Sequence, residues 1–247
     1  YYDGGIVVKI TIVTLFPEYF DSFQTTSIIK RALEHQRVEL ELVNFRDYTL
    51  DKHHNVDDTP CGGGAGMLLS VQPVADCLKA IREKDSLVVM MTPQGKVFHQ
   101  GLARELVGSY EHIILLCGHY EGFDERIRSY VDMELSLGDF VLTGGEAAAL
   151  VISDALIRLV DGVIQEDSHL DDSFENGLLE YPQYTRPVEF DGQRVPDVLL
   201  SGHHENIRKW RLKESLRKTK LKRPDLLAKR TFTKEERKLM VEIEEEM

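Results

Sequence analysis

The sequence predicts an α/β protein with a mostly parallel sheet, followed by a smaller, mainly helical C-terminal domain. Short uncharged runs rich in β-branched residues recur up to Val160, and helical segments separate them, which is typical of a sheet covered on both faces. After Val160 the composition changes to a stretch with six acidic residues and no Lys or Arg. We therefore expect domains over 9–160 and 177–247, joined by an acidic linker over 161–176.

The elements follow from these patterns in order. Predicted strands are the apolar runs at 9–16, 86–92 and 112–118 and the alternating segment 38–45, and Pro93 is expected to end the strand at 86–92. Predicted helices lie at 17–23, 25–35, 70–84, 99–109, 123–131 and 145–160, and segment 134–142 precedes the last of them. The C-terminal part has helical patterns at 205–219 and 233–247.

Charge is distributed unevenly along the chain. The net charge of −12 by itself argues against a nucleic-acid partner. Residues 203–223, however, carry nine Lys or Arg against two Glu, which leaves the cations poorly paired within the segment. The segment therefore predicts a polyanion partner, with a solvated helix face as the alternative.

Other features bear on compartment and metals. No apolar run approaches the ~18 residues of a membrane span and no signal peptide is evident, so we expect no membrane partner. Cys61, Cys77 and Cys117 form no CxxC pair, which favours a reducing cytoplasm over disulfides or zinc. The adjacent histidines at 53–54 and 203–204 lack a third ligand at a suitable spacing, so we expect no metal site.

Three glycine-rich loops are candidates for ligand binding: TPCGGGAGM (59–67), CGHYEGFDER (117–126) and GDFVLTGGE (138–146). Loops at the carboxyl ends of parallel strands are where open α/β sheets bind ligands. None matches a dinucleotide or P-loop fingerprint, and each alone could be a tight turn. Together they predict a small ligand with adenine-like hydrogen-bonding edges or a phosphate.

Longer motifs carry a resemblance to a known family. HNVDDTPCGGGAGM, CGHYEGFDERI, SLGDFVLTGGE, DDSFENGLLEYPQYTRP and VPDVLLSGHHENIRKWRLKESLRKT follow one another in this order, with TLFPEYF before them and KRPDLL after. Nearly all of 9–247 resembles the bacterial tRNA (guanine-N1)-methyltransferases of the SPOUT superfamily. The resemblance implies methyl transfer from S-adenosylmethionine to N1 of the guanine immediately 3′ of the anticodon. It also implies a deep trefoil knot in the sheet domain, a homodimer with a composite site, and possible assistance by Mg²⁺.

The resemblance also assigns residues. Asp172 would be the general base that takes the N1 proton, and Arg158 would stabilise charge on O6. From the residue pattern alone, Asp172 is a solvated linker residue and Arg158 an i,i+4 partner of Asp154. S-adenosylmethionine would bind among Met91, Thr92, Pro93, Gly118, Tyr120, Glu121, Gly122, Ser136, Leu137, Gly138, Asp139, Phe140, Val141, Leu142, Gly144 and Gly145. The tRNA would contact Asp57, Gly66, Arg208, Lys209, Trp210 and Arg211.

Two other classes of protein remain as alternatives. A SPOUT enzyme acting on ribosomal RNA would share the knot but not the DDSF linker together with the GHHENIRKWR segment. A non-catalytic RNA-binding module would need only the basic segment, and it would leave the three glycine loops unexplained.

Overall fold

The computed structural model describes residues 8–164 and 172–247. The chain forms two compact units, Tyr1–Gln165 and Glu166–Met247, and the division falls within the acidic segment 161–176. Part of the predicted linker, 165–171, lies outside the described residues.

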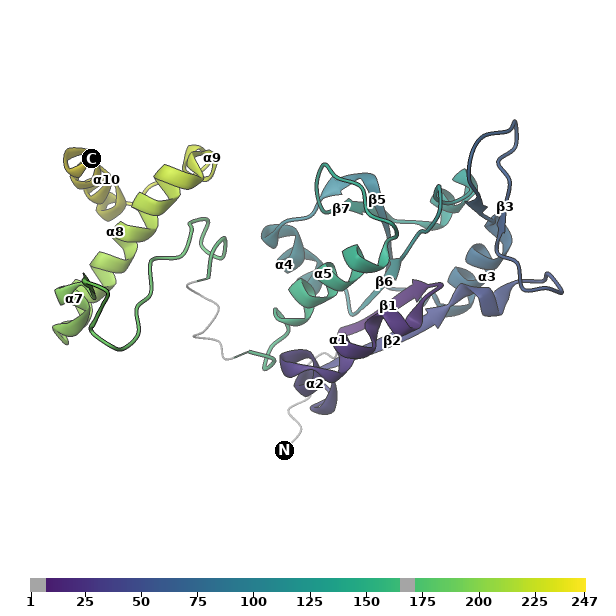
Figure 1. Ribbon diagram of the computed structural model, residues 1–247, viewed down its shortest axis with the longest axis horizontal. Coiled ribbons are helices and arrows are strands. Elements are labelled where there is room, and N and C mark those ends of the chain that lie inside the picture. Colours follow the sequence, from purple (N-terminus) through teal and green to yellow (C-terminus); the bar gives the residue numbers. More distant parts are fainter. Residues whose placement is uncertain (1–7, 165–171) are drawn as a thin grey trace. The chain divides into compact units, whose positions relative to one another are not determined.

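A five-stranded sheet forms the centre of the N-terminal unit (Figure 1). Its strand order is β2-β1-β6-β5-β7, and every neighbouring pair is parallel. The strands are β1 (Val8–Thr14), β2 (Val38–Asn44), β5 (Ser86–Val97), β6 (His112–Leu116) and β7 (Met133–Ser136). The predicted α/β class with a mostly parallel sheet is therefore confirmed.

Helices cover both faces of this sheet. In β6, Ile113 and Leu115 pack into a core with residues of α2, α4 and α5, whereas Ile114 and Leu116 pack into a second core with residues of α3. Two-sided burial explains why the central strand β6 is a continuous apolar run, whereas the edge strand β2 alternates. The helical elements are η1 (Pro17–Phe20), α1 (Asp21–Thr25), α2 (Ser27–Glu34), η2 (Phe45–Tyr48), α3 (Val71–Ile81), α4 (Gln100–Ser109), η3 (Glu125–Tyr130) and α5 (Glu146–Ile157).

Strand β5 differs from the prediction because it continues past Pro93 to Val97. Its pairing with β7 shifts register between Met91 and Lys96, so the residues around Pro93 form an irregularity in the ladder. Proline is tolerated there because a bulge leaves some backbone N–H groups outside the ladder. Residues 91–94, within this irregularity, line the cavity described below.

The C-terminal unit is mainly helical. It contains a short hairpin, β8 (Glu189–Phe190) with β9 (Gln193–Arg194), and the helices α7 (Asp197–Leu200), α8 (His204–Lys222), α9 (Pro224–Ala228) and α10 (Lys234–Glu246). Its core is small and consists of Leu178, Leu216, Leu239 and Ile243, with partly buried neighbours around them. Such a small apolar core makes the polar contacts of this unit important for its stability.

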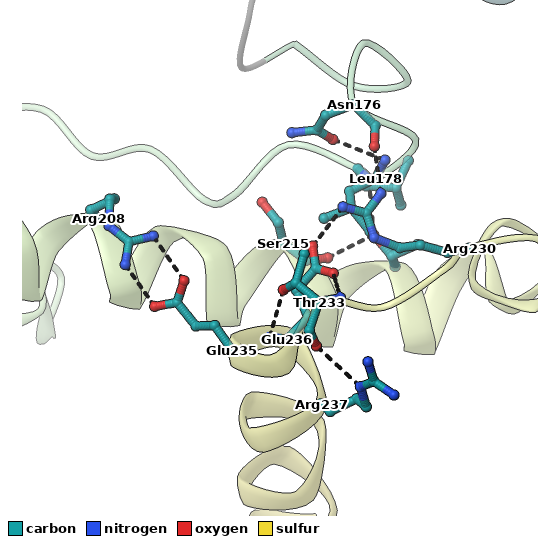
Figure 2. A network of polar contacts seen from close by, with 11 residues as sticks. Asn176, Leu178, Arg208, Ser215, Arg230, Thr233, Glu235, Glu236 and Arg237 are labelled. Carbon is teal, nitrogen blue, oxygen red and sulfur yellow. Dashed lines mark hydrogen bonds and ion pairs between the residues drawn. The ribbon is translucent and has the colours of Figure 1, made fainter.

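A buried polar network anchors the start of α10 (Figure 2). The Glu236 carboxylate is almost fully buried; it accepts hydrogen bonds from the Thr233 N–H at 2.8 Å and from Arg230 at 2.6 Å. The Thr233 hydroxyl accepts in turn from the Glu236 N–H, which completes a capping box. Burial alone would raise the pKa of Glu236, but these hydrogen bonds lower it, so the carboxylate is charged at neutral pH.

We expect Arg230→Met to destabilise the C-terminal unit by about 3–5 kcal/mol, because it leaves the Glu236 charge buried without its cation. Urea unfolding followed by the fluorescence of Trp210, the single tryptophan of the chain, measures this change.

The matched control is Arg237→Met, on α10 next to Glu236. That exposed side chain makes one weak hydrogen bond, at 3.4 Å to the Thr233 carbonyl, so its loss should cost no more than about 0.5 kcal/mol. Equal costs for the two variants would contradict a stabilising role for the network.

Candidate functional site

A cavity of about 470 Å³ lies at the carboxyl edge of the sheet, where β5, β6 and β7 end. Three chain segments line it: 90–94 in and after the buried part of β5, 118–125 after β6, and 135–145 at the end of β7 and beyond. The carboxyl ends of neighbouring parallel strands meet at one edge, so residues far apart in the sequence converge there. A volume of this size suits a ligand of cofactor dimensions.

Two of these segments touch through their backbones. The Gly145 N–H donates to the Gly118 carbonyl at 2.8 Å, and His119 forms a β-bridge with Gly144. A Cβ added to Gly145 would lie 2.8 Å from Cys117 Cα and 2.9 Å from Gly118 N, closer than any real contact. The glycine pair that closes GDFVLTGGE is therefore needed because another stretch of backbone passes directly against it.

A buried carboxylate, that of Glu146, lies next to this backbone contact. Glu146, the first residue of α5, is 4% exposed and accepts a 2.8 Å hydrogen bond from the Thr14 hydroxyl at the end of β1. A Cβ on Gly144 would lie 2.4 Å from Glu146 Oε2 and 2.8 Å from His119 Nδ1. Glu146 and His119 thus flank the Gly144 backbone, and the negative charge suits the N-terminus of a helix.

The charged groups on the cavity wall are mostly engaged in ion pairs. The Arg126 side chain, at 2.7 Å, lowers the pKa of Asp124 to about 2. Arg128 pairs with Glu125 and Glu134. Asp124 is thus stabilised in its ionised form, which makes it a weak base, and burial raises the pKa of Cys117 well above its ordinary value. Neither Asp124 nor Cys117 is a good candidate for acid–base or nucleophilic chemistry at neutral pH.

The glycine-rich segment 59–67 lies against the second cavity loop. It connects the short strands β3 (Asp57–Asp58) and β4 (Leu68–Leu69), and the Met67 carbonyl accepts from the Glu121 N–H at 3.1 Å. Gly66 has φ +82°, and a Cβ there would lie 2.4 Å from Glu121 Cγ. Gly66 is therefore in close contact with a residue of the cavity wall, whereas Asp57 pairs with Leu69 in the hairpin ladder.

All but one of the residues predicted to bind the cofactor line this single cavity. The exception is Asp139, which is exposed within the 138–146 loop and does not line the cavity. The prediction omitted other lining residues, among them Gln94, His119, Phe123, Arg128 and Ala148. His119 could have been found from its place in the GHYEG loop; its Nδ1 is buried without a partner among the described residues.

Comparison with known proteins identifies the family. A family model described as tRNA (Guanine-1)-methyltransferase TrmD matches residues 8–229. The chain belongs to this family. Two relatives, each named tRNA (guanine-N(1)-)-methyltransferase, illustrate the similarity. The one from Clostridium perfringens (strain SM101 / Type A) is 56% identical over 235 residues, covering 94% of this chain and 99% of the relative. The one from Acholeplasma laidlawii (strain PG-8A) is 51% identical over 238 residues, covering 96% and 98%.

The two residues given catalytic roles by resemblance to this family lie in different units. Arg158 is the C-cap of α5, and it is not among the residues that line the cavity. Asp172 lies in the C-terminal unit, where its carbonyl accepts from the Glu175 N–H at 3.2 Å. The roles of Arg158 and Asp172 therefore stay predictions. Asp171 lies outside the described residues.

The basic segment is paired far more completely than the sequence suggested. Several of its cations form ion pairs with carboxylates of α10. Arg208 pairs with Glu235 at 2.6 Å (Figure 2), and it also pairs with Glu205 of its own helix at 2.7 Å. Lys209 lies 3.9 Å from Glu242. The expectation of poor pairing was wrong because it counted anions only within 203–223. Of the other predicted tRNA contacts, Trp210 lies near Tyr184 and Arg211 lies over the Tyr181 ring.

The described residues offer neither a metal-binding cluster nor a membrane-spanning helix. In 8–164 and 172–247, no three His, Cys, Asp or Glu side chains cluster in a way that could hold a metal ion. Within the same residues, every helix is too short or too polar to cross a membrane.

Gly145→Ala tests whether the close backbone contact excludes a side chain at this position. We expect it to destabilise the N-terminal unit by about 1–3 kcal/mol, since the backbone of Cys117 and Gly118 must move to admit the methyl group. Differential scanning calorimetry measures the shift in unfolding temperature.

Gly108→Ala is the control, because a Cβ there meets nothing within 4 Å and the residue lies within α4. It should stabilise the protein by up to about 1 kcal/mol through helix propensity. If both alanines were tolerated alike, the Gly145–Gly118 contact would not be a packing constraint.

Proposed function

We propose that this chain transfers a methyl group from S-adenosylmethionine to N1 of the guanine immediately 3′ of the anticodon in tRNA. The observation that carries the proposal is the family match over 8–229, with similarity to a curated relative over 99% of that relative's length. This match disfavours the alternative of a non-catalytic RNA-binding module, because such a module would match only the C-terminal part of the relative.

The cavity residues fit S-adenosylmethionine. Adenine carries both donors and acceptors, which backbone N–H and C=O groups can recognise without charged side chains. The cavity wall combines glycine backbone at Gly118, Gly138 and Gly144 with apolar side chains such as Leu135 and Leu137. The buried, unpartnered His119 Nδ1 beside Gly144 is one more polar group that a ligand or water could satisfy.

The proposed organisation of the chain follows from this cavity. Residues 9–160 form the cofactor-binding domain, 161–176 the linker and 177–247 the tRNA-binding domain. The 118–122 and 137–145 loops meet at the Gly118–Gly145 contact, and we propose that these loops form part of the trefoil knot of the family.

A homodimer with a composite site accounts for an exposed apolar loop beside the cavity. Phe140, Val141 and Leu142 are 53%, 85% and 42% exposed, although all three line the cavity. A second subunit that covered this loop would bury the exposed surface and contribute residues to the same site.

The proposed chemistry divides between two residues. S-adenosylmethionine, when bound, supplies an electrophilic methyl group. The protein must make guanine N1 nucleophilic, and N1 carries a proton at neutral pH. The Asp172 carboxylate takes that proton as general base. The Arg158 guanidinium stabilises the negative charge that develops on O6. In a homodimer, residues of both subunits can contribute to one such site.

Magnesium is not given a role in these steps. Within 8–164 and 172–247, no three His, Cys, Asp or Glu side chains form a group that could hold a metal ion.

Methylation of tRNA transcripts with labelled S-adenosylmethionine tests the proposed substrate. A transcript with guanine immediately 3′ of the anticodon should accept one methyl group, and the same transcript with adenine at that position should accept none. Methylation of both, or of ribosomal RNA instead, would contradict the proposed target.

Asp172→Asn tests the general base. The amide keeps the size of the side chain but accepts no proton, so the methyl-transfer step should slow by roughly 10²–10⁴. Single-turnover methylation with tRNA and S-adenosylmethionine saturating isolates that step from binding.

Asp171→Asn is the neighbouring control and should cost much less, because that residue has no assigned role. If both variants lost little activity, the base would be another carboxylate, and Glu121 and Asp139 would be the next candidates.

A further inference from the structure

The cations of α8 fall into two sets that differ in their partners. The inner set pairs with glutamates of α10: Lys213 with Glu246 at 2.7 Å, Lys220 with Glu244 at 2.7 Å, and Arg208 and Arg217 likewise with glutamates of that helix. The outer set consists of Arg211, Lys218 and Lys222, and within the described residues none of these three forms an ion pair with a carboxylate.

The outer set lies on one side of the helix. Positions 211, 218 and 222 are seven and four residues apart, and residues at these spacings share a helix face. Lys213 and Lys220 are offset from Arg211 and Lys218 by two residues, which places them on the opposite side of the helix, toward α10. Arg208 is the exception, because it lies three residues from Arg211 and is nevertheless paired with Glu235. The side of α8 on which Lys213 and Lys220 lie therefore explains why they pair with glutamates of α10.

The irregular segment 179–184 runs along α8 beside the outer set and in the opposite direction. The Leu179 N–H donates to the Thr219 hydroxyl at 2.9 Å, and Lys218 donates to the Glu180 carbonyl at 3.0 Å. Further along, Arg211 lies 4.9 Å over the Tyr181 ring. The Tyr184 and Trp210 rings follow, with centroids 6.4 Å apart.

This face combines cations with accessible aromatic rings. Arg211 and Lys222 are exposed, and Tyr184 is 50% exposed. Two carboxylates lie near this face and both have partners: Glu180 accepts a hydrogen bond from Gln183, and Glu214, between Arg211 and Lys218 on the helix, pairs with Arg217 at 3.1 Å. Cations beside stacking platforms are the combination that binds RNA at phosphates and unstacked bases.

We propose that tRNA docks on this outer face, formed by Arg211, Lys218, Lys222, Tyr181, Tyr184 and Trp210, and that α10 withdraws the inner cations from RNA contact. A phosphate that approached an inner cation would have to replace a carboxylate already in place, so the exchange would gain little. The proposal rests on the proposed function, because it takes the RNA to be the tRNA substrate. It also assigns Arg208, which is held by two glutamates, a smaller part in binding than the sequence suggested.

Two double variants test the proposal because they remove equal charge from opposite sides of α8. Lys218→Gln with Lys222→Gln removes two outer cations, and Arg217→Gln with Lys220→Gln removes two inner ones. Filter binding of full-length protein to tRNA across a KCl titration measures affinity and its salt dependence. Circular dichroism and Trp210 fluorescence check that each variant is folded.

The outer double variant should bind tRNA at least about 10-fold more weakly, and the slope of log K against log[salt] should fall by roughly 1.4–1.8, for two lost phosphate contacts. The inner double variant should change affinity less than about threefold. Tyr184→Leu should weaken binding several-fold without changing the slope, because stacking involves no counterion release.

Equal losses in the two double variants would overturn the proposal and leave only a long-range effect of net charge. A larger loss in the inner variant would place RNA on the α10 side. If the inner variant fails to fold, the swap Lys220→Glu with Glu244→Lys replaces it, because it preserves the pair and the net charge, and it should bind tRNA normally. Methylation by the wild-type protein distinguishes a failure of the proposed function from a failure of the docking face. If the wild-type protein methylates no tRNA, the proposed function is refuted. If it methylates tRNA normally but the two double variants lose equal tRNA affinity, only the docking face is refuted.

Discussion

The contact between the Gly145 N–H and the Gly118 carbonyl is the constraint on which the cavity depends. It joins the loop after β7 to the loop after β6, and no side chain fits at Gly145. The buried Thr14–Glu146 hydrogen bond then fixes the start of α5 to the end of β1. These two hydrogen bonds connect the ends of β1, β6 and β7 to the start of α5, so the backbone of the cavity wall is held in a fixed arrangement. Such a wall can present hydrogen-bonding groups to a ligand with little reorganisation.

The C-terminal unit uses charge in a different way. Its apolar core is small, so ion pairs between α8 and α10 and the Arg230–Glu236 network hold its helices together. The same pairs decide which cations remain available to a polyanion. A sequence with net charge −12 can thus carry a basic surface, provided that its glutamates neutralise one side of the basic helix and leave the other open.

The parallel sheet could be predicted from the sequence because a strand buried on both faces needs apolar residues at successive positions, as in 112–118. It predicted most of the cavity through glycines, whose spacing reflects close backbone contacts, and through the family motifs. Pro93 was misread because a register shift against β7 depends on tertiary pairing. The pairing of Arg208 with Glu235 was missed because the partners lie 27 residues apart and meet only when α8 packs against α10. His119 carries no local pattern that reports its burial.

Hydrogen exchange of full-length protein with and without S-adenosylhomocysteine, the demethylated form of the proposed cofactor, tests the central claim most directly. That claim is that the two glycine loops joined by the Gly118–Gly145 contact form the proposed cofactor site. Peptides covering 118–122 and 137–145 should gain protection when the ligand binds, while peptides from α8 and α10 should not. Protection confined to the C-terminal unit, or saturable binding with unchanged exchange in both loops, would contradict it.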